Sequence, residues 1–205
     1  MNFSIDPFTL IIALITIVIA ISLHEMMHAY VGLKLGDTTA HDEGRISLNP
    51  LAHVDPFMTI LLPLITLFLF QTPILAAKPV PFNPDRVKYD EFGAAMIAAA
   101  GPLTNLVLAA IGAALAHGFS GNVDIYNALT IFVAINVGIF IFNLIPIPPL
   151  DGSRVLYAFS PDGVRDVMAQ LEQYGIFIIF GLILFVPAFG AILSNLNRSI
   201  SLFLL

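Results

Sequence analysis

The chain has 205 residues, of which 58% are hydrophobic and only 11% are charged, and it contains no cysteine. Soluble domains carry roughly 25% charged residues, so a water-soluble fold of this size would lack the ionisable groups to cover its surface. The eight Lys and Arg residues form no basic cluster, which excludes a nucleic-acid partner. Without cysteine there is no disulfide, thiolate metal site or thiol nucleophile. The composition predicts a polytopic membrane protein, with one domain over residues 1–205.

Five apolar segments approach or exceed the length of about 20 residues that a transmembrane helix needs. They cover residues 8–31, 57–75, 92–116, 126–145 and 174–193, and a mixed apolar tail follows over 196–205. The second segment is interrupted by Pro63, and the fifth contains Pro187 near its far end. The third is rich in Ala and Gly, which allow helices to approach closely in lipid. These segments predict an all-α membrane fold.

The first segment contains two histidines and a glutamate within an otherwise apolar helix. Ionisable groups inside a membrane are costly and by default mark a functional site. His24 and His28 are four positions apart, so on a helix they share a face and can direct both imidazoles at one metal ion. Glu25 lies beside them and could take a proton from a metal-bound water, as in the HExxH arrangement of zinc metalloproteases. A chance match or a satisfied histidine pair are the alternatives, and the pair leaves the intramembrane glutamate unexplained.

A catalytic zinc ion takes three protein ligands and keeps a fourth position open for water. Candidates for the third ligand are several carboxylates and His41, His53 and His117, and the best is Asp151. Three prolines within 146–149 end the fourth segment just before this aspartate. Irregular backbone at membrane depth is tolerated only against protein or a water-filled cavity. On these residues alone, a metal ligand and an ordinary membrane-boundary aspartate are equal alternatives.

Taken together, the motifs resemble those of the site-2 protease family of intramembrane zinc metalloproteases. Three elements carry the resemblance in the family's order: His-Glu-Met-Met-His at 24–28, Gly-Pro-Leu-Thr-Asn at 101–105, and Asn-Leu-Ile-Pro-Ile-Pro-Pro-Leu-Asp-Gly at 143–152. The stretches 44–56 and 77–83 look like those of the compact prokaryotic branch. The resemblance covers about residues 10–190, and we expect no PDZ or CBS domain.

The resemblance implies that zinc is the cofactor, that His24, His28 and Asp151 bind it, and that Glu25 is the general base. It implies that the substrates are other membrane proteins, cut within or near their transmembrane segments, as in regulated intramembrane proteolysis. The rival function is a metal or proton transporter that uses the same intramembrane cluster. Transporters often show paired repeats and matching broken helices, and the sequence shows neither.

Two further asparagines match family positions that contact substrate or line the catalytic cleft. They are Asn105 and Asn143, and for each the alternative is a hydrogen-bonded amide between helices. For His53, a membrane-boundary position is the alternative to an active-site role. A substrate helix must unwind before cleavage and could then pair with an extended segment. Short β-like strands are therefore expected near the active site, at 44–47 and 78–83.

The zinc ligands also constrain topology, because His28 lies near the end of the first segment and Asp151 just past the end of the fourth. Both must reach one ion, so an even number of crossings separates them, and we predict that 57–75 is a re-entrant or hairpin element. This leaves about four spanning helices. Seven of the eight basic residues then share one side, and only Arg198 lies on the other. Because basic residues favour the cytoplasmic side, we expect both termini outside and the zinc site toward the cytoplasmic leaflet.

Overall fold

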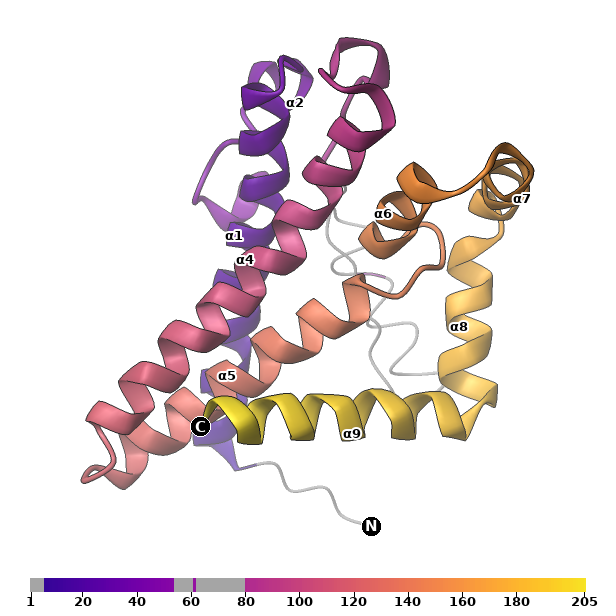
Figure 1. The fold of residues 1–205 in the computed structure, drawn as a ribbon. Helices are drawn as coiled ribbons and strands as arrows, with labels where there is room; N and C mark the ends of the chain where they lie inside the picture. The colour runs from indigo at the N-terminus through magenta and orange to yellow at the C-terminus, as the bar shows by residue number, and fades with distance from the viewer. Residues whose placement is uncertain (1–5, 54–60, 62–79) are drawn as a thin grey trace.

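The computed structural model describes residues 6–53, 61 and 80–205, and every regular element in those ranges is helical (Figure 1). Three long helices form the frame: α1 (Pro7–Lys34), α4 (Asp90–Gly118) and α5 (Val123–Asn143). All three are long and apolar enough to cross a membrane. They confirm the helices predicted over 8–31, 92–116 and 126–145.

The caps of two of these helices follow from the sequence. Asp6 is the N-cap of α1, and its carboxylate accepts hydrogen bonds from the main-chain N–H groups of Phe8 and Thr9. Asn122 is the N-cap of α5, and its side chain accepts a hydrogen bond from the N–H of Ile125. Such side chains satisfy N–H groups that have no partner within the first helical turn. The spans therefore start where polar residues precede the apolar runs.

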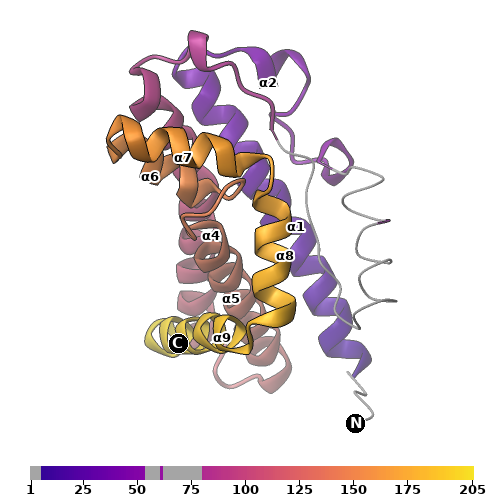
Figure 2. The same cartoon turned by 90° about the vertical axis from the view of Figure 1, so that its right-hand side faces the viewer.

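Shorter helices complete the described part. They are α2 (Thr39–Asp42), α6 (Asp151–Phe159), α7 (Asp162–Glu172), α8 (Gly175–Phe185) and α9 (Pro187–Leu204), with 3-10 turns η1 (Pro50–Ala52) and η3 (Pro84–Arg86). Helices α2, α6 and α7 lie toward one end of the molecule (Figures 1 and 2). Helix α9 lies at the opposite end, where it packs across α5.

The apolar run at 174–193 forms two helices, which corrects the prediction of one continuous fifth segment. Helix α8 ends at Phe185, and Pro187 begins α9. At 1.5 Å per residue, the 11 residues of α8 cover roughly 16 Å, about half of a ~30 Å hydrocarbon core. Helices α7 and α8 together could make one broken span, bent by 77°. The tail at 196–205 is helical to Leu204, as the second half of α9.

Helix α4 packs closely against both α1 and α5 because its buried face carries small residues. Toward the end of α4, Ala109 and Ala113 pack with Val133 and Val137 of α5 in one buried cluster. At Gly112 an added Cβ would lie 2.7 Å from the Phe132 ring. The Ala- and Gly-rich composition therefore produces the close packing that it predicted, and it holds α1 and α5 against the same helix.

The chain leaves α1 and enters α4 at the same end of the molecule. The main-chain oxygen of Leu35 accepts the N–H of Lys88 at 2.9 Å. The buried Asp37 carboxylate accepts the N–H of Asn83 at 2.7 Å. The predicted return of 57–75 lies outside the described residues, but these two hydrogen bonds join the chain before it to the chain after it.

The β-like strands expected at 44–47 and 78–83 are not found in the parts of these stretches that the structure describes, 44–47 and 80–83. Gly44 adopts a left-handed φ of 71°, which glycine tolerates without steric cost. Arg45 is only 2% exposed, and its guanidinium donates to the main-chain oxygen of Ala52 at 2.6 Å. The loop therefore folds around a buried cation, and its backbone is not laid out as a strand.

Candidate metal centre

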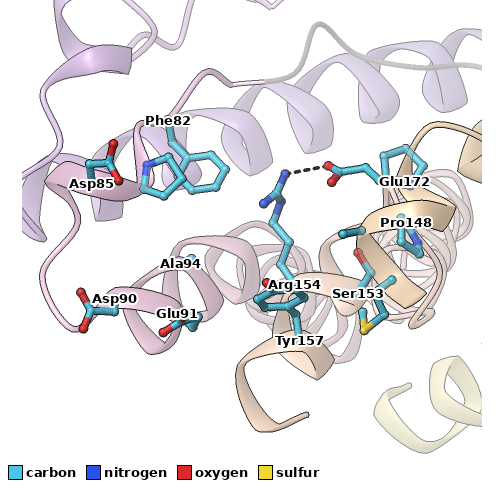
Figure 3. Close-up of a pocket in the computed structure, with 14 residues that line it drawn as sticks. Phe82, Asp85, Asp90, Glu91, Ala94, Pro148, Ser153, Arg154, Tyr157 and Glu172 are labelled. Atoms are coloured by element: carbon cyan, nitrogen blue, oxygen red, sulfur yellow. Dashed lines mark hydrogen bonds and ion pairs between the residues drawn. The ribbon is translucent and has the colours of Figure 1, made fainter. Parts of the chain in front are cut away.

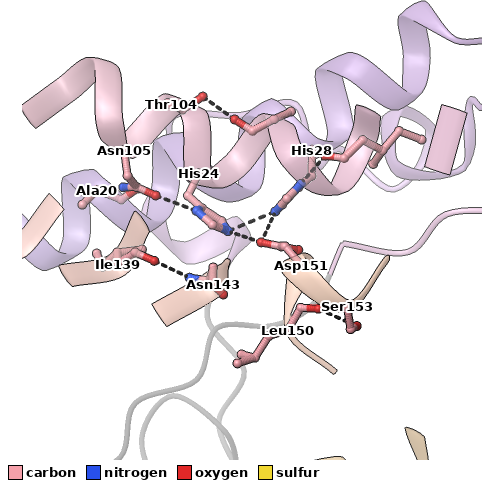
Figure 4. Close-up of polar contacts among 12 residues, drawn as sticks. Ala20, His24, His28, Thr104, Asn105, Ile139, Asn143, Leu150, Asp151 and Ser153 are labelled. Atoms are coloured by element: carbon pink, nitrogen blue, oxygen red, sulfur yellow. Dashed lines mark hydrogen bonds and ion pairs between the residues drawn. The ribbon is translucent and has the colours of Figure 1, made fainter. Parts of the chain in front are cut away.

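Two histidines and an aspartate from distant parts of the chain meet in the core (Figure 4). His24 and His28 lie one turn apart on α1 and are 5% and 7% exposed. Their Nε2 atoms are 3.0 Å apart. The Oδ2 atom of Asp151, the first residue of α6, lies 3.2 Å from one and 3.3 Å from the other. Within residues 6–53 and 80–205, this is the one group of three or more His, Asp or Glu side chains arranged to hold a metal ion.

Both imidazoles are oriented by a hydrogen bond at Nδ1. His28 Nδ1 lies 2.7 Å from the main-chain oxygen of Ile97, and His24 Nδ1 lies 2.6 Å from Oδ1 of Asn105. Because these oxygens only accept hydrogen bonds, each Nδ1 carries the proton and each Nε2 presents a lone pair. Second-shell bonds of this kind orient metal-ligating histidines in known sites. Both rings therefore hold the form that binds a metal.

The space between the three ligand atoms has the electrostatics of a cation site. With both imidazoles neutral and protonated at Nδ1, two lone pairs and a carboxylate oxygen converge there, an arrangement that a cation would stabilise. The Oδ2 atom of Asp151 is buried and has no hydrogen-bond partner in the described part of the chain. A buried polar atom without a partner is costly. A set of two imidazoles and one carboxylate fits a catalytic zinc ion.

A glycine in α4 lets that helix approach both candidate ligand histidines. A Cβ added at Gly101 would lie 2.4 Å from His28 Nε2 and 2.6 Å from His24 Nε2. The next residue, Pro102, removes one N–H from the helix ladder. Gly101 and Pro102 belong to the Gly-Pro-Leu-Thr-Asn motif, but the motif alone indicates no role for Gly101. Its steric contribution is visible only when α1 and α4 are packed together.

A second glycine lets the proline-rich loop pack against α6 and so aim Asp151. At Gly152 an added Cβ would lie 2.2 Å from the main-chain oxygen of Leu144. The Ser153 hydroxyl donates to the main-chain oxygen of Leu150 at 2.7 Å, within the first turn. This packing places Asp151 at the start of α6, directly after the proline-rich loop, with its carboxylate toward the two histidines.

The remaining predicted site residues differ in their surroundings. Asn105 is fully buried, and its amide forms hydrogen bonds with His24 Nδ1 and with the main-chain oxygen of Ala20. This geometry fits an amide between helices, the alternative to a substrate contact. Asn143 is half-buried near Asp151 (Figure 4), and it donates to the main-chain oxygen of Ile139. Glu25 is half-buried and forms no hydrogen bond or ion pair with another described residue.

The other three histidines are not part of the cluster. His41 is exposed on α2 and pairs with Asp42. His117 lies at the far end of α4 and bonds the main-chain oxygen of Ala113. His53 is buried, donates from Nε2 to the main-chain oxygen of Ser47 at 2.8 Å, and has no partner for Nδ1 among the described residues. None of them is a third ligand in this geometry.

A cavity of about 480 Å³ lies between η3, α4, α6 and α7 (Figure 3). Arg154 of α6 contributes to its wall, 3.2 Å from the Glu172 carboxylate and 4.7 Å from the centre of the Phe82 ring. The other charged residues that line the cavity are acidic, namely Asp85, Asp90 and Glu91. Ser153 lines the cavity, but the three ligands do not. The cavity is therefore distinct from the space between the ligand atoms.

Comparisons with known proteins agree with this geometry. The model of Peptidase family M50 matches residues 118–186. A Bacillus subtilis protein named "Putative zinc metalloprotease YwhC" is 41% identical over 188 residues, which cover 86% of this chain and 81% of that protein. A Methanocaldococcus jannaschii protein named "Putative zinc metalloprotease MJ0611" is 34% identical over 155 residues, 76% of this chain and 73% of that protein. No solved structure matches the chain.

Proposed function

Because this chain belongs to peptidase family M50, the site-2 protease family of zinc metalloproteases, we propose that it hydrolyses peptide bonds within or near transmembrane segments of other membrane proteins. The observation that carries this proposal is the convergence of half-buried Asp151 on buried His24 and His28 in a chain with three apolar membrane-length helices. Membership of a protease family decides against the metal or proton transporter considered from the sequence.

The proposed zinc ligands are His24 Nε2, His28 Nε2 and a carboxylate oxygen of Asp151. The two histidine side chains are 6% and 9% exposed, whereas the Asp151 side chain is 19% exposed. The more open side of the site is therefore at Asp151, where water and an unwound substrate can enter. When bound, zinc lowers the pKa of a coordinated water and polarises the scissile carbonyl.

Glu25 is proposed as the general base. It follows His24 directly on α1, and no described residue neutralises its carboxylate with a hydrogen bond or ion pair. A carboxylate in this position can take a proton from the attacking water and pass it to the leaving amine. Asn143 lies near the open side and carries an amide that is only half-buried. We place it at the edge of the substrate cleft.

Replacement of Asp151 by Ala should remove zinc from the protein, because two imidazoles alone leave the ion without its anionic ligand. The wild-type chain should bind one zinc ion, measured by elemental analysis after purification. Asp162→Ala is the matched control, since Asp162 also begins a short helix but its side chain is 98% exposed. Full zinc occupancy in Asp151→Ala would remove Asp151 from the ligand set.

In liposomes, cleavage of a reporter transmembrane segment by the wild-type protein should stop when zinc is chelated and return when zinc is added.

We further propose that the metal centre faces the cytoplasmic leaflet and that both termini are outside. The chain has no native cysteine, so single cysteines can report topology. Cysteines at Ala52 and Asp85 should both react with a membrane-impermeant thiol reagent from the cytoplasmic side. A cysteine at Gly121, in the exposed turn between α4 and α5, should react only from outside. If the Asp85 position reacted only from outside, residues 57–75 would span and this topology would be wrong.

A further inference from the structure

A second buried asparagine lies behind the metal centre, outside all three motifs. Asn136 is on α5 and is 0% exposed, and it faces Asn105 of α4, which is also 0% exposed. Buried amides are costly unless their polar atoms are paired. These two are paired in a chain of hydrogen bonds that runs from α5 through α4 to α1 and ends at His24.

The direction of each bond in this chain is fixed by main-chain oxygens, which can only accept. Asn136 donates from Nδ2 to the main-chain oxygen of Phe132 at 2.9 Å. Its Oδ1 is thereby turned toward Asn105 and accepts from that residue's Nδ2 at 3.0 Å. Nδ2 of Asn105 also donates to the main-chain oxygen of Ala20 at 3.3 Å. The only orientation left for the Asn105 amide places its oxygen against His24 Nδ1.

The orientation of the Asn105 amide determines which ring nitrogen of His24 carries the proton. An amide oxygen at His24 Nδ1 requires the ring proton there and leaves the lone pair on Nε2, the atom that faces Asp151. A flipped Asn105 amide would present N–H to Nδ1 and favour the tautomer with its proton on Nε2, which cannot bind a metal. His28 needs no such support, because the main-chain oxygen of Ile97 accepts from its Nδ1 directly.

We propose that Asn136 is a positioning residue for the metal site: through Asn105 it sets the tautomer of His24 that binds zinc. The inference rests on the proposed zinc site. Among the described residues, the hydrogen bonds of Asn136 join it to Phe132 and Asn105 and to none of the proposed metal ligands, so we expect it to act by orienting Asn105. The bond from Asn105 to Ala20 persists without Asn136, so we expect a weakened site and not an abolished one.

The test is zinc affinity of the full-length apoprotein, measured in detergent by competition with a chromogenic chelator. Asn136→Leu removes the acceptor for Asn105 and should weaken zinc binding by about 10-fold, the lower end of second-shell effects. Asn136→Ser can keep the bond to Phe132 but is too short to reach Asn105, so it should show a similar loss. Asn136→Asp keeps an acceptor toward Asn105 and, as the neutral acid, also keeps a donor toward Phe132, so it should bind zinc within about twofold of wild type.

Asn197 provides the matched control, since it also carries an interhelical amide and donates to the main-chain oxygen of Ala134 at 3.0 Å. Asn197→Leu should lose comparable thermal stability and keep wild-type zinc affinity. Wild-type affinity in folded Asn136→Leu or Asn136→Ser, or an equal loss in Asn197→Leu, would overturn the inference. A wild-type protein that binds no zinc would instead overturn the proposed function.

Discussion

Glu25→Gln should abolish cleavage while leaving one zinc ion bound per chain. Glutamine is close in size to glutamate but cannot take a proton from the attacking water, and general acid–base groups contribute about 10²–10⁴-fold to rate. The metal should remain, because the three proposed ligand atoms belong to His24, His28 and Asp151. Cleavage of a reporter transmembrane segment and zinc content, measured on the same preparation, give the two readouts.

The matched control is Glu172→Gln, which removes an exposed carboxylate that lines the cavity, 3.2 Å from Arg154. It should cleave like wild type. Comparing membrane-protein fragments in cells that carry wild type or Glu25→Gln would also identify the natural substrates. Substantial cleavage by Glu25→Gln would assign the proton transfer to another group, and loss of zinc would place Glu25 among the ligands.

The parts of the fold that the sequence predicted correctly have local signals. Each of α1, α4 and α5 is a single apolar run bounded by polar residues, and length alone identifies such a run as a membrane helix. His24 and His28 are joined by the four-residue spacing of one helix face. Asp151 was a weaker candidate for the third ligand, since it is more than a hundred positions away. Only the packing of α6 against α4 places it beside the two imidazoles.

Features that the sequence did not predict depend on geometry between distant segments. The run at 174–193 is apolar on both sides of Pro187, so hydropathy cannot distinguish one helix from two that meet at an angle. Asn136 appears in the sequence as one polar residue within an apolar helix. Its partner Asn105 is 31 positions away, so no motif links them. The direction of the hydrogen bond between Asn136 and Asn105 depends on how α4 and α5 pack, and no short sequence pattern indicates it.

Gly101→Ala should prevent tight zinc binding without unfolding the protein. The added Cβ would lie 2.4 Å from His28 Nε2 and 2.6 Å from His24 Nε2, far inside normal contact distance. Neither ring can turn away without losing its Nδ1 bond, to Ile97 in one case and Asn105 in the other. Alanine favours a helix over glycine by roughly 0.5–1 kcal/mol, so α4 itself should persist. We expect zinc affinity to fall by about 100-fold or more, above the effect of a typical second-shell change.

Chelator competition and circular dichroism on the same sample separate loss of metal from loss of helix. Gly190→Ala on α9 is the control, because an added Cβ there meets no atom within 4 Å among the described residues. It should match wild type in both measurements. If Gly101→Ala bound zinc as tightly as Gly190→Ala, α4 could move away from α1 at little cost. The metal site would then be held by α1 and α6, and the bare backbone at Gly101 would not be a requirement for the ion.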